Sequence, residues 1–263
     1  MAATASLKEL HEHFSDMQKA KERYLVTKSA FFDDTITDMF SKFIKIYSSG
    51  EVKGDTLIGL CCGAYIYYTL PACKYFNKII YACSDDKSIQ ETQKWLKNEP
   101  NAIDWSDAIK KISELQGNGE MWKENQCMLQ GKVQKVIRCD VTSSNPLSPI
   151  TEPQADCLLL AHCLEHFVTD KKSYTDALKN VSTLLKPGGH LVMSACLEAT
   201  FYMVGDFKFP ILFMDDGFVK DALTKAGYVI DDVHIFYRKA DSLYDIADYK
   251  GVIVLKAHKK TEM

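Results

Sequence analysis

The sequence has no long apolar run, no stretch rich in Pro, Gly and Ser, no internal repeat and no strong excess of either charge. Because a membrane helix needs about 20 apolar residues, no segment is predicted to span a bilayer. The N-terminal letters MAATASLKELHEHFSD also lack the apolar stretch of a secretory signal. With 32 basic and 35 acidic residues, the net charge of −3 favours neither nucleic acid nor a membrane as partner.

What the sequence does contain is typical of a globular protein. Its 263 residues are 46% hydrophobic and 25% charged, which is enough to bury a core and excludes a disordered chain. Nine cysteines are scattered, largely inside apolar runs such as DCLLLAHCL, and do not form a compact disulfide-rich segment. Since no secretory segment accompanies them, we expect reduced thiols and a cytoplasmic protein.

Short apolar runs alternate with amphipathic segments along most of the chain. Residues 1–47 are predicted to be helical, because apolar side chains from Phe31 to Ile44 recur at helical spacing. The apolar runs predict strands at residues 56–60, 78–84, 135–141, 155–163, 190–196, 229–238 and 251–260. Between them, helices are predicted at residues 61–73, 85–98, 101–132, 170–186 and 217–228. The fourth of these should stop at Pro187-Gly188-Gly189, which predicts a break and a flexible turn.

This alternation predicts βαβ units and therefore a mainly parallel sheet. The last two strands have no helical pattern between them, so they are expected to form an antiparallel pair. Ligands of such sheets bind at the carboxyl ends of the strands, near the point where the strand order reverses. That rule selects four segments as candidate sites: residues 59–63, 83–86, 139–141 and 161–166.

Several motifs occur together: KGDTLI before the first strand, QKWLKNEPNAIDW after the second, RCDVT at the third, ADCLLL at the fourth, LLKPGGHLV at the fifth, and FYMVG with a downstream KAGY. As a set they resemble the small-molecule N-methyltransferases that include the nicotinamide, indolethylamine and phenylethanolamine enzymes. LLKPGG alone is common in S-adenosylmethionine enzymes, whereas EPNAIDW in register with KGD and RCDVT is specific. The resemblance covers nearly the whole chain and is strongest to the nicotinamide and indolethylamine members.

The resemblance implies an α/β fold, that of a Rossmann-like class I S-adenosylmethionine-dependent methyltransferase. Its features are a mostly parallel sheet, a C-terminal antiparallel strand pair and an N-terminal helical lid. One domain is expected over residues 1–263, with the lid at 1–50 and the core at 51–263. The expected protein is a monomer that transfers a methyl group from S-adenosylmethionine directly to the nitrogen of a small amine or pyridine-type molecule. Because the thioether leaving group needs no protonation, no catalytic acid or base is expected.

Five residues match family positions that contact the cofactor. Gly63 is the second glycine of the loop after the first strand, where the backbone approaches the methionyl group. Asp140 and Val141 match the pair that binds the adenine edge, through a carboxylate and a backbone N–H. Tyr67 matches a tyrosine beside the cofactor, and a simple packing role is equally expected of it. Ala161 ends the fourth strand, where a small residue suits cofactor binding.

Other family positions have changed. The acid at the end of the first strand is replaced by Gly59, and the first loop glycine by Cys61, which adds bulk where the cofactor passes. The acid that binds the ribose is replaced by Cys83, a poor acceptor. Asp85 is the candidate substitute for that ribose contact, whereas Asp86 is expected to cap the following helix.

The acceptor side shows the same mixture of retained and changed positions. Tyr24 matches an aromatic residue of the lid beside the cofactor, and Tyr202 matches one that lines the acceptor pocket. The family's pocket acid is replaced by Ala195, and two serines of the nicotinamide enzyme by Ala199 and Ile211. A pocket with fewer polar groups should bind nicotinamide poorly, so the sequence leaves open a more apolar amine, another acceptor or no acceptor at all.

Two alternatives stay open from the sequence. The changed contacts are also compatible with a catalytically weakened or inactive methyltransferase-fold binding protein. Separately, residues 162–166 spell H-x-x-E-H, a pattern of inverted zinc peptidases. Because the run directly follows an apolar strand and no third ligand is evident, the histidines are expected in a loop near the acceptor, and no metal is predicted.

Overall fold

The structure is a computed structural model of the whole chain, and it describes residues 34–61, 63–204, 207–239 and 247–261. Most of the predicted lid therefore lies outside the described residues, including Tyr24. Within the described ranges, no helix is both long enough and apolar enough to cross a membrane. The eight cysteines in these ranges all have free thiols, as expected from their scatter.

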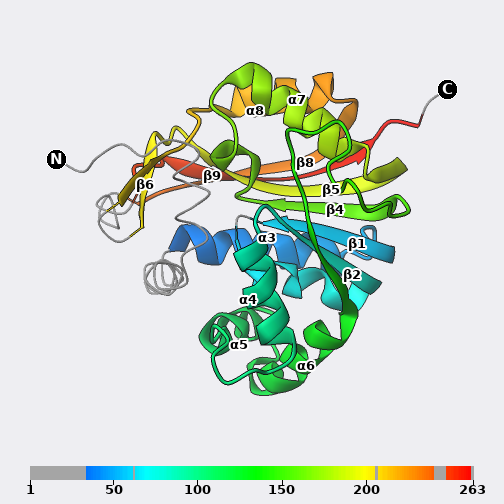
Figure 1. Cartoon of the computed structure of the whole chain (residues 1–263). Coiled ribbons are helices and arrows are strands. Elements are labelled where there is room, and N and C mark those ends of the chain that lie inside the picture. Colours follow the sequence, from blue (N-terminus) through cyan, green and yellow to red (C-terminus); the bar gives the residue numbers. More distant parts are fainter. Residues whose placement is uncertain (1–33, 62, 205–206, 240–246, 262–263) are drawn as a thin grey trace.

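A seven-stranded sheet forms the centre of the molecule (Figure 1). Its strand order is β3-β2-β1-β4-β5-β9-β8, in which only β9 and its two neighbours pair antiparallel. The strands are β1 (Gly54–Cys61), β2 (Phe76–Cys83), β3 (Val133–Arg138), β4 (Ala155–Ala161), β5 (Leu185–Leu197), β8 (Tyr228–Tyr237) and β9 (Gly251–Lys259). The predicted parallel sheet and its antiparallel C-terminal pair are thus confirmed.

The two central strands explain why this sheet is buried on both faces. β1 and β4 are nearly unbroken apolar runs, and such runs suit a parallel strand covered by helices on either side. The strand order reverses between β1 and β4, which pair from Leu57 with Cys157 to Cys61 with Ala161. Their carboxyl ends therefore meet at one edge of the sheet, where ligands of doubly wound folds bind.

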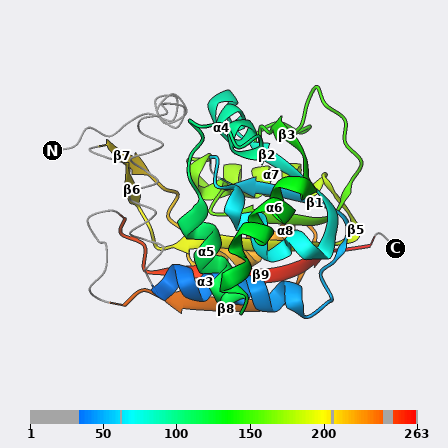
Figure 2. The same cartoon turned by 90° about the horizontal axis from the view of Figure 1, so that it is seen from below.

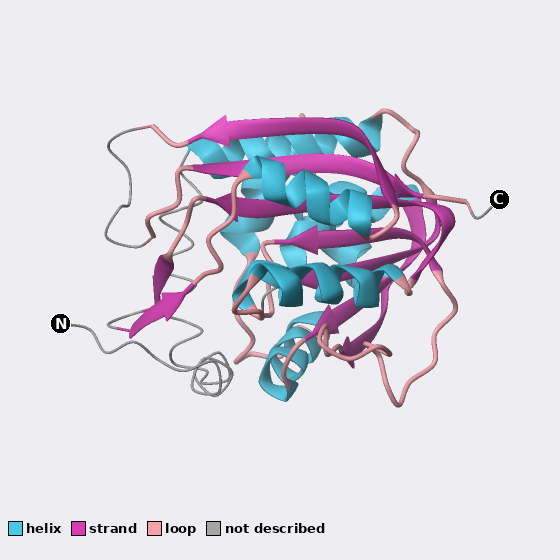
Figure 3. Ribbon diagram, turned by 90° about the horizontal axis from the view of Figure 1, so that it is seen from above, coloured by secondary structure: helices cyan, strands magenta, loops and turns pink. Residues whose placement is uncertain are grey.

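Helices cover both faces of the sheet, as Figures 1 and 2 show. One apolar cluster lies between the sheet and α3, η1 and α5, and the other lies under α7 and α8. Figure 3 looks onto the sheet and shows the helices in cyan in front of and behind the magenta strands. The helices are α3 (Asp34–Ser48), η1 (Ile66–Tyr75), α4 (Asp86–Leu96), α5 (Ser106–Leu115), η2 (Gly119–Met121), α6 (Trp122–Lys132), η3 (Leu164–His166), α7 (Lys171–Ser182) and α8 (Asp216–Lys225).

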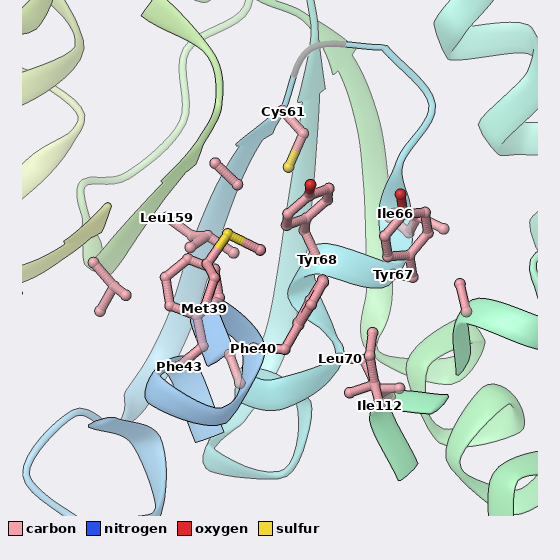
Figure 4. Close-up of a cluster of buried hydrophobic side chains, with 14 of the residues drawn as sticks. Met39, Phe40, Phe43, Cys61, Ile66, Tyr67, Tyr68, Leu70, Ile112 and Leu159 are labelled. Carbon is pink, nitrogen blue, oxygen red and sulfur yellow. The ribbon is translucent and has the colours of Figure 1, made fainter. Parts of the chain in front are cut away.

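Aromatic side chains fill the space between α3 and η1 (Figure 4). The ring of Phe40 lies 5.1 Å from Tyr68 and 6.3 Å from Tyr67, and the two tyrosines stack at 5.0 Å. Trp105 closes the cluster at 4.9 Å from Tyr67. Pairs at these distances stabilise the packing beyond their buried area. The cluster fixes α3 against η1, which directly follows the carboxyl end of β1.

Two local predictions differ from the structure, and one element was not predicted. The helix predicted at residues 61–73 is a 3-10 helix over Ile66–Tyr75, which contains Pro71, a residue with no N–H to donate within an α-helix. The α7 helix already ends at Ser182, and Pro187-Gly188-Gly189 lies in the irregular start of β5, where the register with β4 shifts. A two-stranded hairpin, β6 (Phe201–Val204) with β7 (Phe207–Pro210), is present where the sequence gave no prediction.

Candidate functional site

The four segments selected from the sequence meet at the carboxyl edge of the sheet. Cys61 pairs with Ala161 across β1 and β4, and Cys83 lies at the neighbouring end of β2. The backbone N–H of Cys139 donates to the Cys83 carbonyl at 2.8 Å, so the chain after β3 joins the same edge. The residues predicted to contact the cofactor from β1, β2, β3 and β4 therefore lie on adjacent strand ends.

The loop after β1 keeps the backbone geometry for which glycine is suited. Gly63 has a φ of +95°, a left-handed conformation that other residues rarely adopt, and an added Cβ would lie 3.4 Å from the Tyr65 ring. The hydroxyl of Tyr81 on β2 donates to the Gly63 carbonyl at 2.9 Å. The Gly63 carbonyl is thus fixed by a buried side chain of β2.

Gly59 stands where the family has an acid on β1, and the Thr69 side chain fills the space beside it. A Cβ built on Gly59 would lie 2.8 Å from the Thr69 methyl carbon. Thr69 is fully buried, and its hydroxyl donates to the Ile66 carbonyl at 2.7 Å, so its side chain cannot turn away freely. Gly59 is therefore required by the close approach of η1 to the sheet, and the acid has no space to return.

The cysteine at the end of β2 cannot replace the ribose-binding acid electrostatically. Cys83 is buried, and burial raises its pKa well above 9, with the nearby Asp85 charge adding to the shift. A thiol with such a pKa stays neutral and accepts hydrogen bonds weakly. This agrees with the expectation from the sequence.

The capping residue of α4 is Asp85, not Asp86 as predicted. The Asp85 carboxylate accepts hydrogen bonds from the Ser88 N–H at 2.8 Å and the Ser88 hydroxyl at 2.7 Å. Asp86 instead lies in the first turn and forms an exposed ion pair with Arg138 at 3.0 Å. The reason is geometric, since the extended Asp85 backbone is the one that directs a carboxylate onto the free N–H groups of the first turn.

The segment after β3 presents polar groups outward. Asp140 is exposed, and its Oδ1 accepts from the N–H and hydroxyl of Thr142 at 2.9 and 2.7 Å, which leaves Oδ2 available. The Val141 carbonyl accepts from the Asn180 amide of α7 at 3.0 Å. Across the described ranges, the Val141 N–H has no hydrogen-bond acceptor. An acceptor–donor pair on adjacent residues is what binding an adenine edge requires.

Two further residues predicted beside the cofactor are fully buried. Tyr67 has no exposed surface and belongs to the aromatic cluster, so its packing role is established. Ala161 ends β4 with 1% of its surface exposed. Its small side chain adds little bulk at the junction of β1 and β4.

The two predicted acceptor-side residues are not brought together. Tyr202 on β6 packs in the same apolar cluster as α3, stacking on Phe209 at 5.4 Å. Ala195 on β5 belongs to the other cluster, under α7 and α8, because alternate residues of a strand point to opposite faces. The structure therefore separates Ala195 from Tyr202 by the sheet.

A polar cluster that the sequence revealed only in part lies at the ends of β4 and β5. His162, which has a φ of +44°, places its Nδ1 at 3.4 Å from the Cys196 Sγ and 3.7 Å from the Glu165 Oε1. Burial lowers the pKa of His162, but Cys196 and Glu165 outweigh burial and raise it to about 10. His166, the other histidine of H-x-x-E-H, packs edge-on against Tyr202 at 4.9 Å.

Two features of this edge fit S-adenosylmethionine and one does not. The turn at Gly63 has the left-handed backbone that favours glycine, and Asp140 with Val141 offers the acceptor and donor that adenine needs. The ribose position fits poorly, because Cys83 is neutral and Asp85 already serves α4. The residues present therefore fit the cofactor at its adenine and methionyl ends.

Known proteins resemble the chain over most of its length. The sequence profile of the NNMT/PNMT/TEMT family matches residues 4–260. An indolethylamine N-methyltransferase of Oryctolagus cuniculus is 38% identical over 216 residues, which are 82% of this chain and 81% of the relative. A nicotinamide N-methyltransferase of Sus scrofa is 36% identical over 248 residues, which are 94% of this chain and 93% of the relative.

Solved structures agree on the fold. Magnesium protoporphyrin IX methyltransferase of Synechocystis PCC 6803, with bound SAM, superposes with a TM-score of 0.59 at 11% identity, over 99% of this chain and 100% of that one. The N-methyltransferase NodS of Bradyrhizobium japonicum WM9, in complex with S-adenosyl-L-homocysteine, gives 0.53 at 11% identity, over 87% and 89%. The chain has the methyltransferase fold predicted for it, it is an S-adenosylmethionine-dependent enzyme, and it belongs to the NNMT/PNMT/TEMT family.

Proposed function

We propose that this enzyme methylates the nitrogen of a small amine or pyridine-type molecule, working in the cytoplasm as a monomer without nucleic-acid or membrane partners. The family match and the names of its relatives, which are nicotinamide and indolethylamine N-methyltransferases, support the class of acceptor. The observation that carries the proposal is the strand edge itself. There the Gly63 turn after β1 and the Asp140–Val141 pair after β3 lie at the same edge of the sheet, on either side of the end of β2.

Each site residue has a proposed role at this edge. Asp140 Oδ2 accepts from the exocyclic amine of adenine, and the Val141 N–H donates to the ring. Gly63 and Ala161 let the backbone approach the methionyl group. Tyr67 forms part of the wall beneath the cofactor through its packing. The proposed contact of Asp85 with the ribose adds one hydrogen bond to a carboxylate that also caps α4.

Residues 1–50 are proposed to form the helical lid and residues 51–263 the Rossmann-like core of one domain, with the described part of the lid, α3, packed on the sheet. Tyr24 is the lid residue proposed to contact the cofactor. S-adenosylmethionine supplies the electrophilic methyl group, so the chain needs only to align the acceptor nitrogen with it and to exclude water. The buried aromatic cluster around Phe40 and Tyr67 supports that exclusion from one side.

The acceptor is proposed to be more apolar than nicotinamide. Tyr202 presents a stacked aromatic ring on β6, whereas Ala195 supplies no acid and packs on the opposite face of the sheet. Without a pocket carboxylate to hold a polar amide, recognition depends on ring stacking and apolar contact.

Transfer of an isotopically labelled methyl group to a panel of amines tests this proposal. Purified protein should label aromatic and aliphatic amines more rapidly than nicotinamide. Tyr202→Ala should raise KM for the best acceptor about 10-fold or more, and Tyr202→Phe should retain most of the activity. Absence of transfer to every amine, with S-adenosylmethionine bound, would refute the proposed reaction.

A further inference from the structure

Three potential metal ligands converge at the ends of β4 and β5. The His162 Nδ1, a Glu165 carboxylate oxygen and the Cys196 Sγ all lie within 4.8 Å of one another. The Nδ1 lies 3.4 Å from the sulfur and 3.7 Å from Oε1. On a tetrahedral zinc ion, with bonds of about 2.0–2.3 Å, neighbouring ligand atoms are roughly 3.3–3.8 Å apart. The two distances from the His162 Nδ1 fall in this range, and the Glu165 and Cys196 ligand atoms lie within 4.8 Å of each other.

The arrangement is not that of a nucleophile–base relay. In a relay, the acid and the nucleophile contact opposite nitrogens of the imidazole. Here both Glu165 and Cys196 face the same nitrogen, Nδ1, while Nε2 lies 3.2 Å from the Met39 sulfur. Because that sulfur can only accept, Nε2 keeps its proton and directs the coordinating atom at the other two groups.

The Glu165 carboxylate supplies a second, independent observation. Only 1% of its surface is exposed, and its Oε2 has no hydrogen-bond partner within the described ranges. Its Oε1 accepts from the Cys196 N–H at 3.2 Å. His162 faces the carboxylate only through Oε1, at 3.7 Å, so Oε2 stays without a hydrogen-bond partner in the described part of the chain, which is costly for a buried oxygen.

We propose that His162, Glu165 and Cys196 bind one divalent cation of the zinc class, with a fourth position open. A thiolate and a carboxylate would exactly neutralise such an ion, which suits a buried site. Imidazole and thiolate ligands favour zinc over magnesium or calcium. His162 and Cys196 are partly accessible, so the ion has a route of entry.

The backbone is built to hold these ligands. The His162 N–H donates to the Ser194 carbonyl at 2.9 Å, which ties the end of β4 to β5 just before Cys196. The Glu165 carbonyl accepts from the Leu212 N–H at 3.1 Å. The ligand set differs from that of the H-x-x-E-H pattern, because Cys196 takes the place of His166, whose ring packs on Tyr202. No peptidase activity is inferred.

Metal binding by the full-length protein tests the proposal. Chelator-treated protein is dialysed against Zn²⁺, and bound metal is counted by elemental analysis. We expect one ion per chain for the unsubstituted protein and for Cys127→Ser, which removes an exposed thiol on α6. Cys196→Ser and Glu165→Gln should each weaken binding more than about 100-fold, since even groups beyond the ligands change metal affinity 10- to 100-fold.

Two further measurements support this test, and the first does not depend on whether a variant folds. In the unsubstituted protein, Zn²⁺ should raise the melting temperature and Mg²⁺ should not. Co²⁺ should produce a thiolate-to-metal charge-transfer band that Cys196→Ser abolishes and Cys127→Ser retains. Sub-stoichiometric zinc, or equal binding by Cys196→Ser and the unsubstituted protein, would overturn the proposal. None of these readouts involves methyl transfer, so the metal site can fail while the proposed function stands.

Discussion

The ends of β1 and β2 and the ends of β4 and β5 lie at the same edge of one sheet, yet they carry opposite kinds of side chain. At β1 and β2, the acids expected from the family are replaced by Gly59 and Cys83, both enclosed by apolar packing. At β4 and β5, a buried group of histidine, glutamate and cysteine occupies the edge. Two acids are thus missing at the ends of β1 and β2, whereas three ionisable side chains gather at the ends of β4 and β5.

The contrast shows that the effect of a changed motif residue depends on the side chains that pack against it. Gly59 is matched by Thr69, which fills the space that an acid would need. The cofactor must then be held chiefly from β3 and the Gly63 loop. Substitutions at the ends of β1, β2 and β3 should therefore differ in whether they change stability, cofactor binding or both.

Restoring the family's acid should damage the fold. Gly59→Asp forces a Cβ against the Thr69 methyl group and buries an unpaired carboxylate, at a cost of about 3 kcal/mol or more. Chemical denaturation measures this loss. Gly131→Asp is the matched control, because an added Cβ there meets nothing within 4 Å, and its stability should hardly change. Undiminished stability of Gly59→Asp with tighter cofactor binding would mean that the β1 end is still an open cofactor site.

Removing the adenine contact should weaken binding without unfolding the protein. Asp140→Ala should lower the affinity for S-adenosylmethionine roughly 10- to 100-fold, the loss expected for a hydrogen bond to a charged group. Thr142→Val is the control, since it removes the hydroxyl bond to Oδ1 and keeps the carboxylate. Calorimetric titration of both variants decides the case, and equal affinities would remove Asp140 from the site.

Asp85 tests whether the β2 end retains any cofactor role. Asp85→Ala should destabilise the protein by about 1 kcal/mol, the usual cost of losing an N-cap. Asp85→Asn keeps a capping side chain and should be nearly as stable as the unsubstituted protein. If Asp85 also contacts the ribose, the Asn variant binds S-adenosylmethionine more weakly, and unchanged affinity would leave the residue as a cap alone.

Asp156 lies near the start of β4, at the edge of the sheet opposite the candidate site, so substituting it should not change cofactor binding. Asp156 accepts from the N–H groups of Asp55 and Thr56, both at 2.9 Å. Burial raises the pKa of Asp156, but the ion pair with Lys186 and these N–H donors outweigh burial and hold it below 3.8. The group therefore contributes stability above about pH 3.8 that is lost as the pH falls further.

Asp156→Asn should accordingly be slightly less stable than the unsubstituted protein at neutral pH. The difference should shrink in acid, which denaturation across a pH series measures. A constant difference at every pH would show that the carboxylate charge is not the stabilising feature.

The sequence predicted the sheet because short, distinct apolar runs mark its strands, and the parallel order because helical patterns separate them. It also located the four candidate segments at one edge. It did not predict the β6–β7 hairpin, whose four-residue strands are too short for a clear pattern. The Asp85 cap was assigned to its neighbour, because adjacent acids look alike in sequence and only the backbone angles separate them.

The cluster of His162, Glu165 and Cys196 could not be predicted from the sequence pattern. Cys196 lies 34 residues away along the chain, and the pairing of Ala161 with Ser194 in the β4–β5 register is what brings it near. No local spacing encodes that register, so the motif suggested His166 as the second group. Likewise, the close approach of the Thr69 methyl group to Gly59 depends on how η1 packs on β1, which the sequence pattern does not specify.

The most direct test of this account is a calorimetric titration of the full-length, unsubstituted protein with S-adenosylmethionine and with its demethylated product. Saturable one-to-one binding of both ligands is the predicted result, with affinity supplied by the β3 end and the Gly63 loop despite the neutral β1 and β2 ends. A flat titration with either ligand at millimolar concentration would contradict the account.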